Sequence, residues 1–117
     1  MRKNRARFAE GQRERNRIHG RRYSLKHKFG LTLERWDEIL IEQSGRCYLC
    51  EEPMNGVIHV DHDRSCCSGN KSCGRCVRGL AHQKCNQGIG QFGDDPYRLR
   101  RAADNLEKAT IRLAERA

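Results

Sequence analysis

The spacing of apolar residues predicts little regular structure at the start of the chain. Residues 1–22 are rich in Arg, and their few apolar side chains form no stripe along a helix. Such a segment cannot bury enough apolar surface to order itself, which predicts a disordered or weakly helical arm. A short helix is expected over Arg21–Lys28, ending at Gly30, because glycine readily adopts the left-handed conformation found at helix ends.

A clearer helical pattern follows this arm. Thr32 is a suitable N-cap, and the helix is expected to run to about Gln43. Apolar residues recur in it at helical spacing, so one face should pack inward. That face consists of Leu33, Trp36, Ile39 and Leu40.

The middle of the chain predicts a β-hairpin followed by a short helix. Val57–Val60 and Val77–Leu80 are β-branched runs expected to pair antiparallel, with residues 63–76 as an irregular loop between them. Cys85 and Asn86 should begin or lie in the helix that follows. Three glycines are expected to break that helix up: Gly88, Gly90 and Gly93.

The last segment predicts an amphipathic helix. Asp94 or Asp95 is the expected N-cap, and Pro96 suits the first helical turn. The chain therefore divides into an arm (1–22), a helical lead-in (23–45), a central core (46–93) and a terminal helix (94–117). The apolar face of that helix comprises Leu99, Ala102, Ala103, Leu106, Thr110 and Leu113.

The basic charge is concentrated near the start of the chain. The formal net charge is +9, and residues 1–30 hold eleven basic groups against Glu10 and Glu14. The remaining residues balance at thirteen basic and thirteen acidic groups. Such a segment contacts nucleic acid or is simply solvated, and the rest of the chain favours nucleic acid. Its candidate DNA-contacting residues are Arg13, Arg15, Arg17, Arg21 and Arg22.

The size and cysteine content indicate a small domain held together by metal. A chain of 117 residues with few apolar side chains has a marginal core and needs disulfides, metal or a partner. No apolar run approaches a membrane span, and no secretory signal opens the chain, so a cytoplasmic location is expected. In a reducing compartment cysteines bind metal more often than they form disulfides. The odd count of seven cysteines fits this reading.

Two pairs of zinc-type ligands have the same spacing. Cys47 and Cys50 are separated by two residues, as are His82 and Cys85. Zinc prefers tetrahedral sites of thiolate and imidazole, and such a pair offers two ligands from one tight turn. Because the pairs flank the predicted hairpin, they predict a structural zinc site rather than buried cysteines and a surface histidine.

Four more cysteines lie in the loop between the predicted strands. A second metal is one interpretation, and free thiols or a redox bridge are the others. Adjacent cysteines bind one ion awkwardly, so the sequence leaves these alternatives open. The four are Cys66, Cys67, Cys73 and Cys76.

Candidate catalytic residues stand where the first strand ends. Neighbouring side chains face one site only where a strand ends or bulges, which places Asp61 and His62 at such a point. Asp61 is a hard oxygen donor suited to Mg²⁺ or Mn²⁺, and a neutral His62 can accept a proton from water. Asn86, next to the predicted zinc ligand Cys85, could offer its carbonyl oxygen to the same ion.

These motifs together resemble the recombination endonuclease VII family of HNH, or His-Me finger, nucleases. The resemblance covers about residues 30–106 and implies an α+β fold, a zinc-stabilised ββα-metal core flanked by helices. It implies that Asp61 and Asn86 hold a catalytic Mg²⁺ and that His62 is the general base. By resemblance, such a protein is expected to be encoded in a phage-type genome and to act in a bacterial host cell. The motifs are Cys47-x-x-Cys50, His59-Val60-Asp61-His62-Asp63, Val77–Leu80 and Cys85-Asn86.

The chain departs from that family pattern at several points. Position 82 is His where members usually carry Cys, an exchange that zinc accepts. Arg64 stands where a further His is frequent and could grip a phosphate, and Arg78 is a second candidate DNA contact. The chain also ends soon after the motifs, without the long extension that junction-resolving members use to dimerise.

The sequence therefore predicts a metal-dependent DNA endonuclease. One alternative is a homodimeric enzyme that resolves branched DNA, such as Holliday junctions. The other is a zinc-stabilised DNA-binding module without catalysis, which has no need of Asp61, His62 and Asn86 together.

Overall fold

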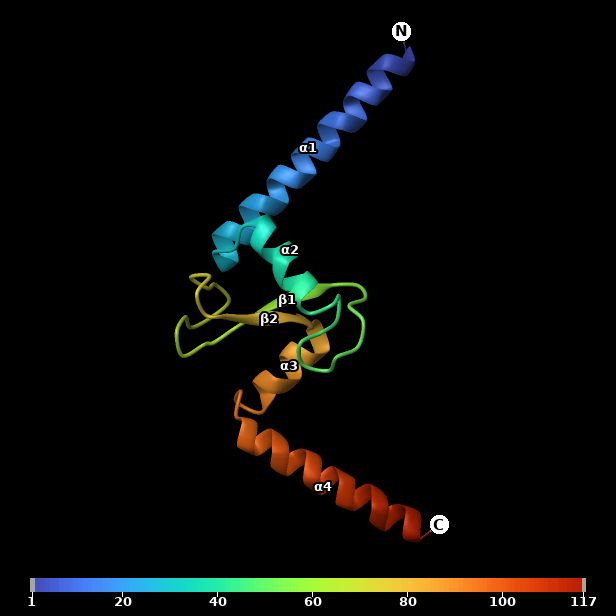
Figure 1. Ribbon diagram of the computed structural model, residues 1–117, viewed down its shortest axis with the longest axis vertical. Helices are drawn as coiled ribbons and strands as arrows, with labels where there is room; N and C mark the ends of the chain where they lie inside the picture. Colours follow the sequence, from blue (N-terminus) through green and yellow to red (C-terminus); the bar gives the residue numbers. More distant parts are fainter. Residues whose placement is uncertain (1, 117) are drawn as a thin grey trace.

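The computed structural model describes residues 2–116, and side-chain surroundings from residue 9 onward. The part described is a small α+β protein with four helices and one two-stranded sheet. Two long helices, α1 (Arg2–Phe29) and α4 (Pro96–Glu115), extend from opposite ends of a central region, α1 toward the top and α4 toward the bottom of the view (Figure 1). The central region holds α2 (Leu33–Glu42), β1 (Ile58–His62), β2 (Val77–His82) and α3 (Gln83–Gln91).

Helix α1 is continuous from Arg2 to Phe29, which corrects the expected disordered or weakly helical arm. Arg, Lys, Glu, Gln and Ala have high helix propensity, so a sequence without an apolar stripe can still be helical. Side chains one turn apart also pair along it, since Arg17 lies 2.7 Å from Glu14. Among its side chains from residue 9 onward, those of the last turns pack against the core, through buried Leu25 and half-buried Phe29.

The core lies where the end of α1, α2 and the sheet meet. Thr32 caps α2 as predicted, its hydroxyl accepting the Arg35 backbone N–H at 3.0 Å. The predicted inward face of α2 is also confirmed, with Ile39 buried and Leu33, Trp36 and Leu40 packed around it. The buried core residues are Leu25, Leu31, Ile39, Val60 and Leu80.

The two strands pair antiparallel as predicted, and each ends two residues later than expected. Val60 lies opposite Leu80 and Asp61 opposite Gly79. His62 then lies opposite Val77, so the register shifts between Asp61 and His62. Such a bulge breaks the alternation of side chains, and Asp61 and His62 are both buried.

Helix α3 follows β2 directly and carries Cys85 and Asn86, as predicted. It continues through Gly88 and Gly90 to Gln91, so the expected break at these two glycines is wrong. A helical glycine costs only about 0.5–1 kcal/mol relative to alanine, which weakens a short helix without ending it. The helix ends before Gly93, whose φ of +69° is the left-handed conformation.

Helix α4 begins as predicted, because the Asp95 carboxylate accepts the backbone N–H groups of Tyr97 and Arg98. Its apolar face is present but lacks a covering element in the described chain. Leu106 remains 70% exposed and Leu113 62% exposed. Across residues 2–116, no helix is both long enough and apolar enough to pass through a membrane.

Candidate functional site

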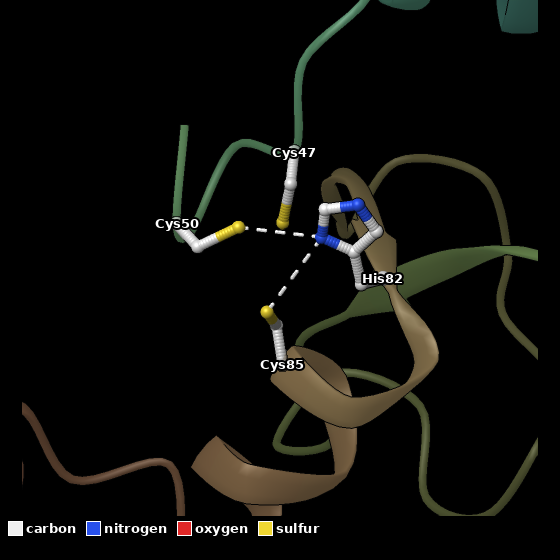
Figure 2. Close-up of side chains that lie close together, drawn as sticks. All are labelled: Cys47, Cys50, His82 and Cys85. Atoms are coloured by element: carbon white, nitrogen blue, oxygen red, sulfur yellow. Dashed lines mark hydrogen bonds between the residues drawn. The ribbon is translucent and has the colours of Figure 1, made fainter. Parts of the chain in front are cut away.

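The first predicted metal site is assembled as one cluster. The ligand atoms of Cys47, Cys50, His82 and Cys85 all lie within 4.8 Å of one another (Figure 2). His82 Nδ1 is 3.3 Å from Cys50 Sγ and 3.9 Å from Cys85 Sγ. Zinc–sulfur and zinc–nitrogen bonds of about 2.3 and 2.0 Å give tetrahedral edges of about 3.6 Å. The cluster can therefore hold a zinc ion.

The histidine and one thiol of this cluster are prepared for metal. His82 Nε2 lies 2.9 Å from the Pro53 carbonyl, which can only accept, so Nε2 carries the proton. The lone pair of Nδ1 is then directed to the sulfurs. Burial opposes ionisation of Cys47, but nearby backbone N–H groups more than offset it and lower its pKa to about 6. A thiolate at neutral pH is the form that binds zinc.

The sheet positions this cluster. Cys47 and Glu52 are joined by a backbone hydrogen bond of 2.9 Å, and Glu51 completes the turn with a φ of +64°. The Tyr48 N–H donates to the Leu80 carbonyl at 3.1 Å, which joins the turn to β2. His82 ends β2 and Cys85 follows one turn into α3, so the hairpin delivers both halves of the cluster.

The four other cysteines form a second cluster. The sulfur atoms of Cys66, Cys67, Cys73 and Cys76 also lie within 4.8 Å of one another. Two of these separations are 3.9 Å, between Cys66 and Cys73, and 4.0 Å, between Cys73 and Cys76. All four cysteines are free thiols.

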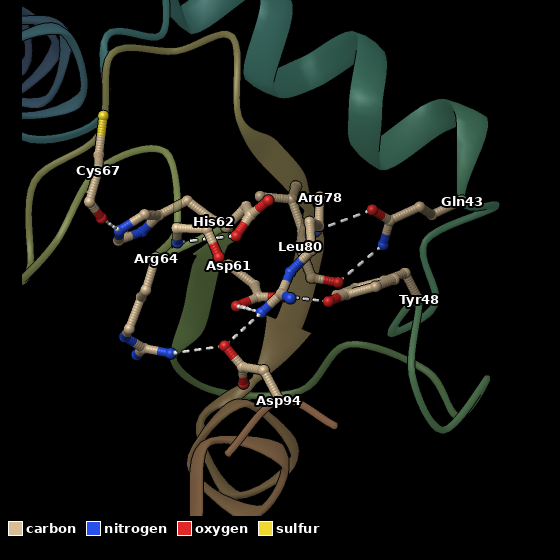
Figure 3. A network of polar contacts seen from close by, with 11 residues as sticks. Gln43, Tyr48, Asp61, His62, Arg64, Cys67, Arg78, Leu80 and Asp94 are labelled. Carbon is tan, nitrogen blue, oxygen red and sulfur yellow. Dashed lines mark hydrogen bonds and ion pairs between the residues drawn. The ribbon is translucent and has the colours of Figure 1, made fainter. Parts of the chain in front are cut away.

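The predicted catalytic residues also come together. Asp61, His62 and Asn86 line one cavity of about 360 Å³. It adjoins a larger open groove of about 1050 Å³, because Asn86 and Arg64 line both. The groove is also lined by Arg78 of β2, whose guanidinium lies between Asp61 and Asp94 (Figure 3).

Both carboxylate oxygens of Asp61 accept hydrogen bonds. The residue is 1% exposed, and Arg78 grips it with both ends of its guanidinium, Nε to Oδ2 at 2.8 Å and Nη2 to Oδ1 at 3.0 Å. The Tyr48 hydroxyl donates to Asp61 Oδ2 as well. Burial and this carboxylate raise the pKa of Tyr48, which stays a neutral donor. The hydrogen bond to Asp61 likewise raises the pKa of Arg78.

His62 is held in one orientation. Its Nε2 lies 3.0 Å from the Cys67 carbonyl, and the residue is 4% exposed. Because a carbonyl only accepts, Nε2 carries the proton and the neutral ring has its lone pair on Nδ1. One nitrogen is therefore fixed by the loop and the other is free to accept a proton.

Two buried oxygen atoms in the groove lack a donor. Asn86 Oδ1 and Asp94 Oδ1 have no hydrogen-bond partner among the described residues. Asp94 Oδ2 lies 3.2 Å from Arg78 and 3.4 Å from Arg64. Unpaired buried acceptors are costly, and an ordered water or a bound cation satisfies them. The groove therefore combines cationic side chains with open oxygen donors.

Comparison with protein families decides the relationship. The model of the recombination endonuclease VII family matches residues 20–108. The chain belongs to the recombination endonuclease VII family. No curated protein and no solved structure matches it. Membership of the endonuclease VII family indicates a nuclease and implies DNA as the substrate.

The basic residues predicted to contact DNA lie in two places on this endonuclease VII chain. Arg64 and Arg78 line the groove. The others are exposed along α1, although some have acidic or aromatic neighbours. Arg22 pairs with Glu34 at 2.6 Å, and Arg21 stacks over the Trp36 ring at 4.4 Å. The full set on α1 is Arg13, Arg15, Arg17, Arg21 and Arg22.

Three residues of this region were not predicted as site residues from the sequence. Tyr48 donates to Asp61, and its ring lies where a side chain on Gly79 would be, 2.8 Å from that missing Cβ. Asp94 was expected only as a possible helix cap, and its φ of +54° has no sequence signal apart from the preceding glycine. Gln43 bonds both backbone groups of Leu80, at 2.8 and 2.9 Å, and so holds β2 against α2.

Proposed function

We propose that this endonuclease VII family member is an HNH-type nuclease that hydrolyses DNA phosphodiester bonds with one Mg²⁺-type ion. The observation that carries the proposal is the state of His62. Its Nε2 is fixed to the Cys67 carbonyl, and it shares a cavity with Asp61 and Asn86 beside the groove that Arg64 and Arg78 line. A histidine held in this tautomer suits a general base that takes a proton from the attacking water at Nδ1.

The oxygen donors of the site fit a divalent cation. Asn86 Oδ1 and Asp94 Oδ1 are buried acceptors without donors, and Asp61 is a buried carboxylate in the same region. Asp61 and Asn86 would hold Mg²⁺ or Mn²⁺, both of which prefer oxygen ligands. When bound, the ion would stabilise negative charge on the phosphate and on the leaving 3′ oxygen.

Arg78 compensates the charge of Asp61 in the structure as it stands. Its guanidinium lies between two carboxylates, bonded to Asp61 and 3.2 Å from Asp94. A cation held by Asp61 would take over that compensation and release Arg78 for a phosphate oxygen. Arg64, with its side chain 45% exposed in the same groove, is available for the same role.

A zinc ion in the cluster of Cys47, Cys50, His82 and Cys85 would have a structural role. It would use four protein ligands and leave no open position, as structural zinc sites do. Asn86 directly follows Cys85, and β2 ends at His82. The ion would therefore fix the hairpin and α3 relative to each other, and with them the cavity that contains His62.

The decisive experiment compares His62→Ala with the parental protein on supercoiled plasmid and on a four-way junction, with and without Mg²⁺. Loss of the base should lower cleavage by about 10²–10⁴-fold while DNA binding persists. His19→Ala, an exposed histidine on α1, is the matched control and should cut at the parental rate. Parental-rate cleavage by His62→Ala would refute the role of His62.

The same assay separates the alternatives. Preferential cutting of the junction by a dimer would identify a branched-DNA resolving enzyme. DNA binding without any metal-dependent cleavage would identify a zinc-stabilised binding module. Asp61→Ala and Asn86→Ala should weaken metal affinity, so high Mg²⁺ or Mn²⁺ should partly restore their activity.

A further inference from the structure

The loop between β1 and β2 brings four cysteine sulfurs to the spacing of a tetrahedral metal site. Zinc–sulfur bonds of about 2.3 Å place the ligands of a four-thiolate site about 3.8 Å apart. The separations of 3.9 Å between Cys66 and Cys73 and 4.0 Å between Cys73 and Cys76 match that edge. A disulfide would need about 2.05 Å between one pair and would leave the other two thiols unused.

We propose that Cys66, Cys67, Cys73 and Cys76 bind a second zinc ion. From the sequence, the adjacent residues Cys66 and Cys67 were expected to bind one ion awkwardly. In the structure the backbone N–H groups of both donate to the Asp63 carbonyl, at 3.1 and 3.2 Å. This tight turn brings both sulfurs to the same side as Cys73 and Cys76.

The cysteine count supports the same assignment. The chain has seven cysteines, and the two clusters together contain all of them. Each cluster offers four ligand atoms, which is the coordination number of structural zinc. Zinc binding would release the thiol protons to solvent and would require no oxidant or reductant.

The loop has few other means of holding its shape. Residues 63–76 contain no residue of the buried core, and most are exposed. The loop nevertheless grips the end of α1, where the Ser72 N–H and hydroxyl donate to the carbonyls of Lys28 and Phe29 at 2.8 and 2.7 Å. A Cβ on Gly74 would lie 2.4 Å from the Gly30 carbonyl oxygen, so the two backbones touch. A second zinc would hold this joint between α1 and the hairpin.

The site would also position His62, a step that depends on the proposed function. The Cys67 carbonyl accepts from His62 Nε2, so one proposed zinc ligand also supplies the atom that fixes the histidine. Loss of the ion would free Cys67 and allow the ring of His62 to change tautomer or rotate. Cys67 is thus a positioning residue, because it acts through His62.

The experiment uses the full chain purified without chelator. Native mass spectrometry should count two zinc ions per chain, and X-ray absorption should find seven sulfur and one nitrogen ligands over the two ions. Cys73→Ser with Cys76→Ser should lower the count to one. Ser68→Ala, an exposed residue of the same loop, is the matched control and should keep two.

The outcomes separate clearly. One zinc per parental chain overturns the proposal, and so does a disulfide in the loop or an unchanged count in the double variant. If the double variant does not fold, the parental zinc count and ligand ratio still decide. In the folded variant, nitrogen-15 NMR spectra should no longer show a single tautomer of His62. Its cleavage rate should fall while its affinity for DNA stays the same. Two zinc ions in the parental chain, one of them lost in the double variant, together with a dispensable His62 would support the second zinc site and refute the proposed base.

Discussion

Removing the guanidinium of Arg78 should show how much the stability of the core depends on its ion pair with Asp61. Asp61 is 1% exposed and receives both hydrogen bonds of the Arg78 fork. Arg78→Met keeps much of the apolar stem but leaves a buried carboxylate with only the Tyr48 hydroxyl as donor. An uncompensated buried charge is costly even where the intact pair contributes little net stability.

The expected loss in free energy of unfolding is about 3 kcal/mol, at the low end of the ~3–5 kcal/mol for breaking a buried pair. The low end applies because the Arg78 side chain is 31% exposed and Tyr48 continues to donate. Urea unfolding of zinc-loaded protein without Mg²⁺ measures it. A slope of about 2 kcal/mol per molar urea places the midpoint about 1.5 M lower.

Two further variants show whether the charge of Asp61 is the cause. Arg75→Met, in the exposed loop, should change stability by less than about 0.5 kcal/mol. Adding Asp61→Asn to Arg78→Met should recover about 1–2 kcal/mol, because the neutral amide needs no counter-charge. This reasoning would be contradicted if Arg78→Met were as stable as the parental protein, or if the double variant were less stable than Arg78→Met alone.

Two more predictions concern metal and the basic helix. Strong chelation should unfold the central region, because its core is small and zinc binding is coupled to folding. Circular dichroism should show a loss of helical signal as zinc is released. A zinc-free preparation with full structure would contradict this. Deletion of residues 2–20 should keep zinc and metal-dependent cleavage but weaken duplex binding and flatten its salt dependence, by about 0.9 in log–log slope per lost phosphate contact. Equal slopes for truncated and full-length protein would show that this part of α1 does not contact DNA.

Sequence patterns predicted the features that depend on local spacing. The ligand pairs Cys47–Cys50 and His82–Cys85 are each set by one turn, and a hairpin between them brings the pairs together. The caps at Thr32 and Asp95 are also local, since each side chain bonds backbone groups two or three residues away. The sheet was recognisable for the same reason, although its ends were placed two residues short.

Features that depend on distant contacts or on helix propensity were missed. The continuity of α1 does not come from burial of an apolar face, so the lack of an apolar stripe in the sequence was not evidence against a helix. The contacts of Asp61 join residues far apart in the chain, from Tyr48 in the turn between Cys47 and Cys50 to Arg78 on β2. Asp94 comes near Arg78 because α3 ends at Gln91 and the chain turns at Gly93, which no periodicity reveals. The roles of His62 and Asn86 stay predictions.

The length of α1 has a geometric consequence for the shape of DNA it can follow. A helix of 28 residues is about 42 Å long, which equals about twelve base pairs of B-form duplex. One helical turn of DNA is about 10.5 base pairs, so each phosphate strand winds away from a straight rod well within that span. Side chains along the full length of a straight rod of that size therefore cannot all follow one strand of an unbent duplex. They would reach phosphates along the whole length of the rod only by crossing a groove to the other strand, or on DNA whose path bends or branches beside it.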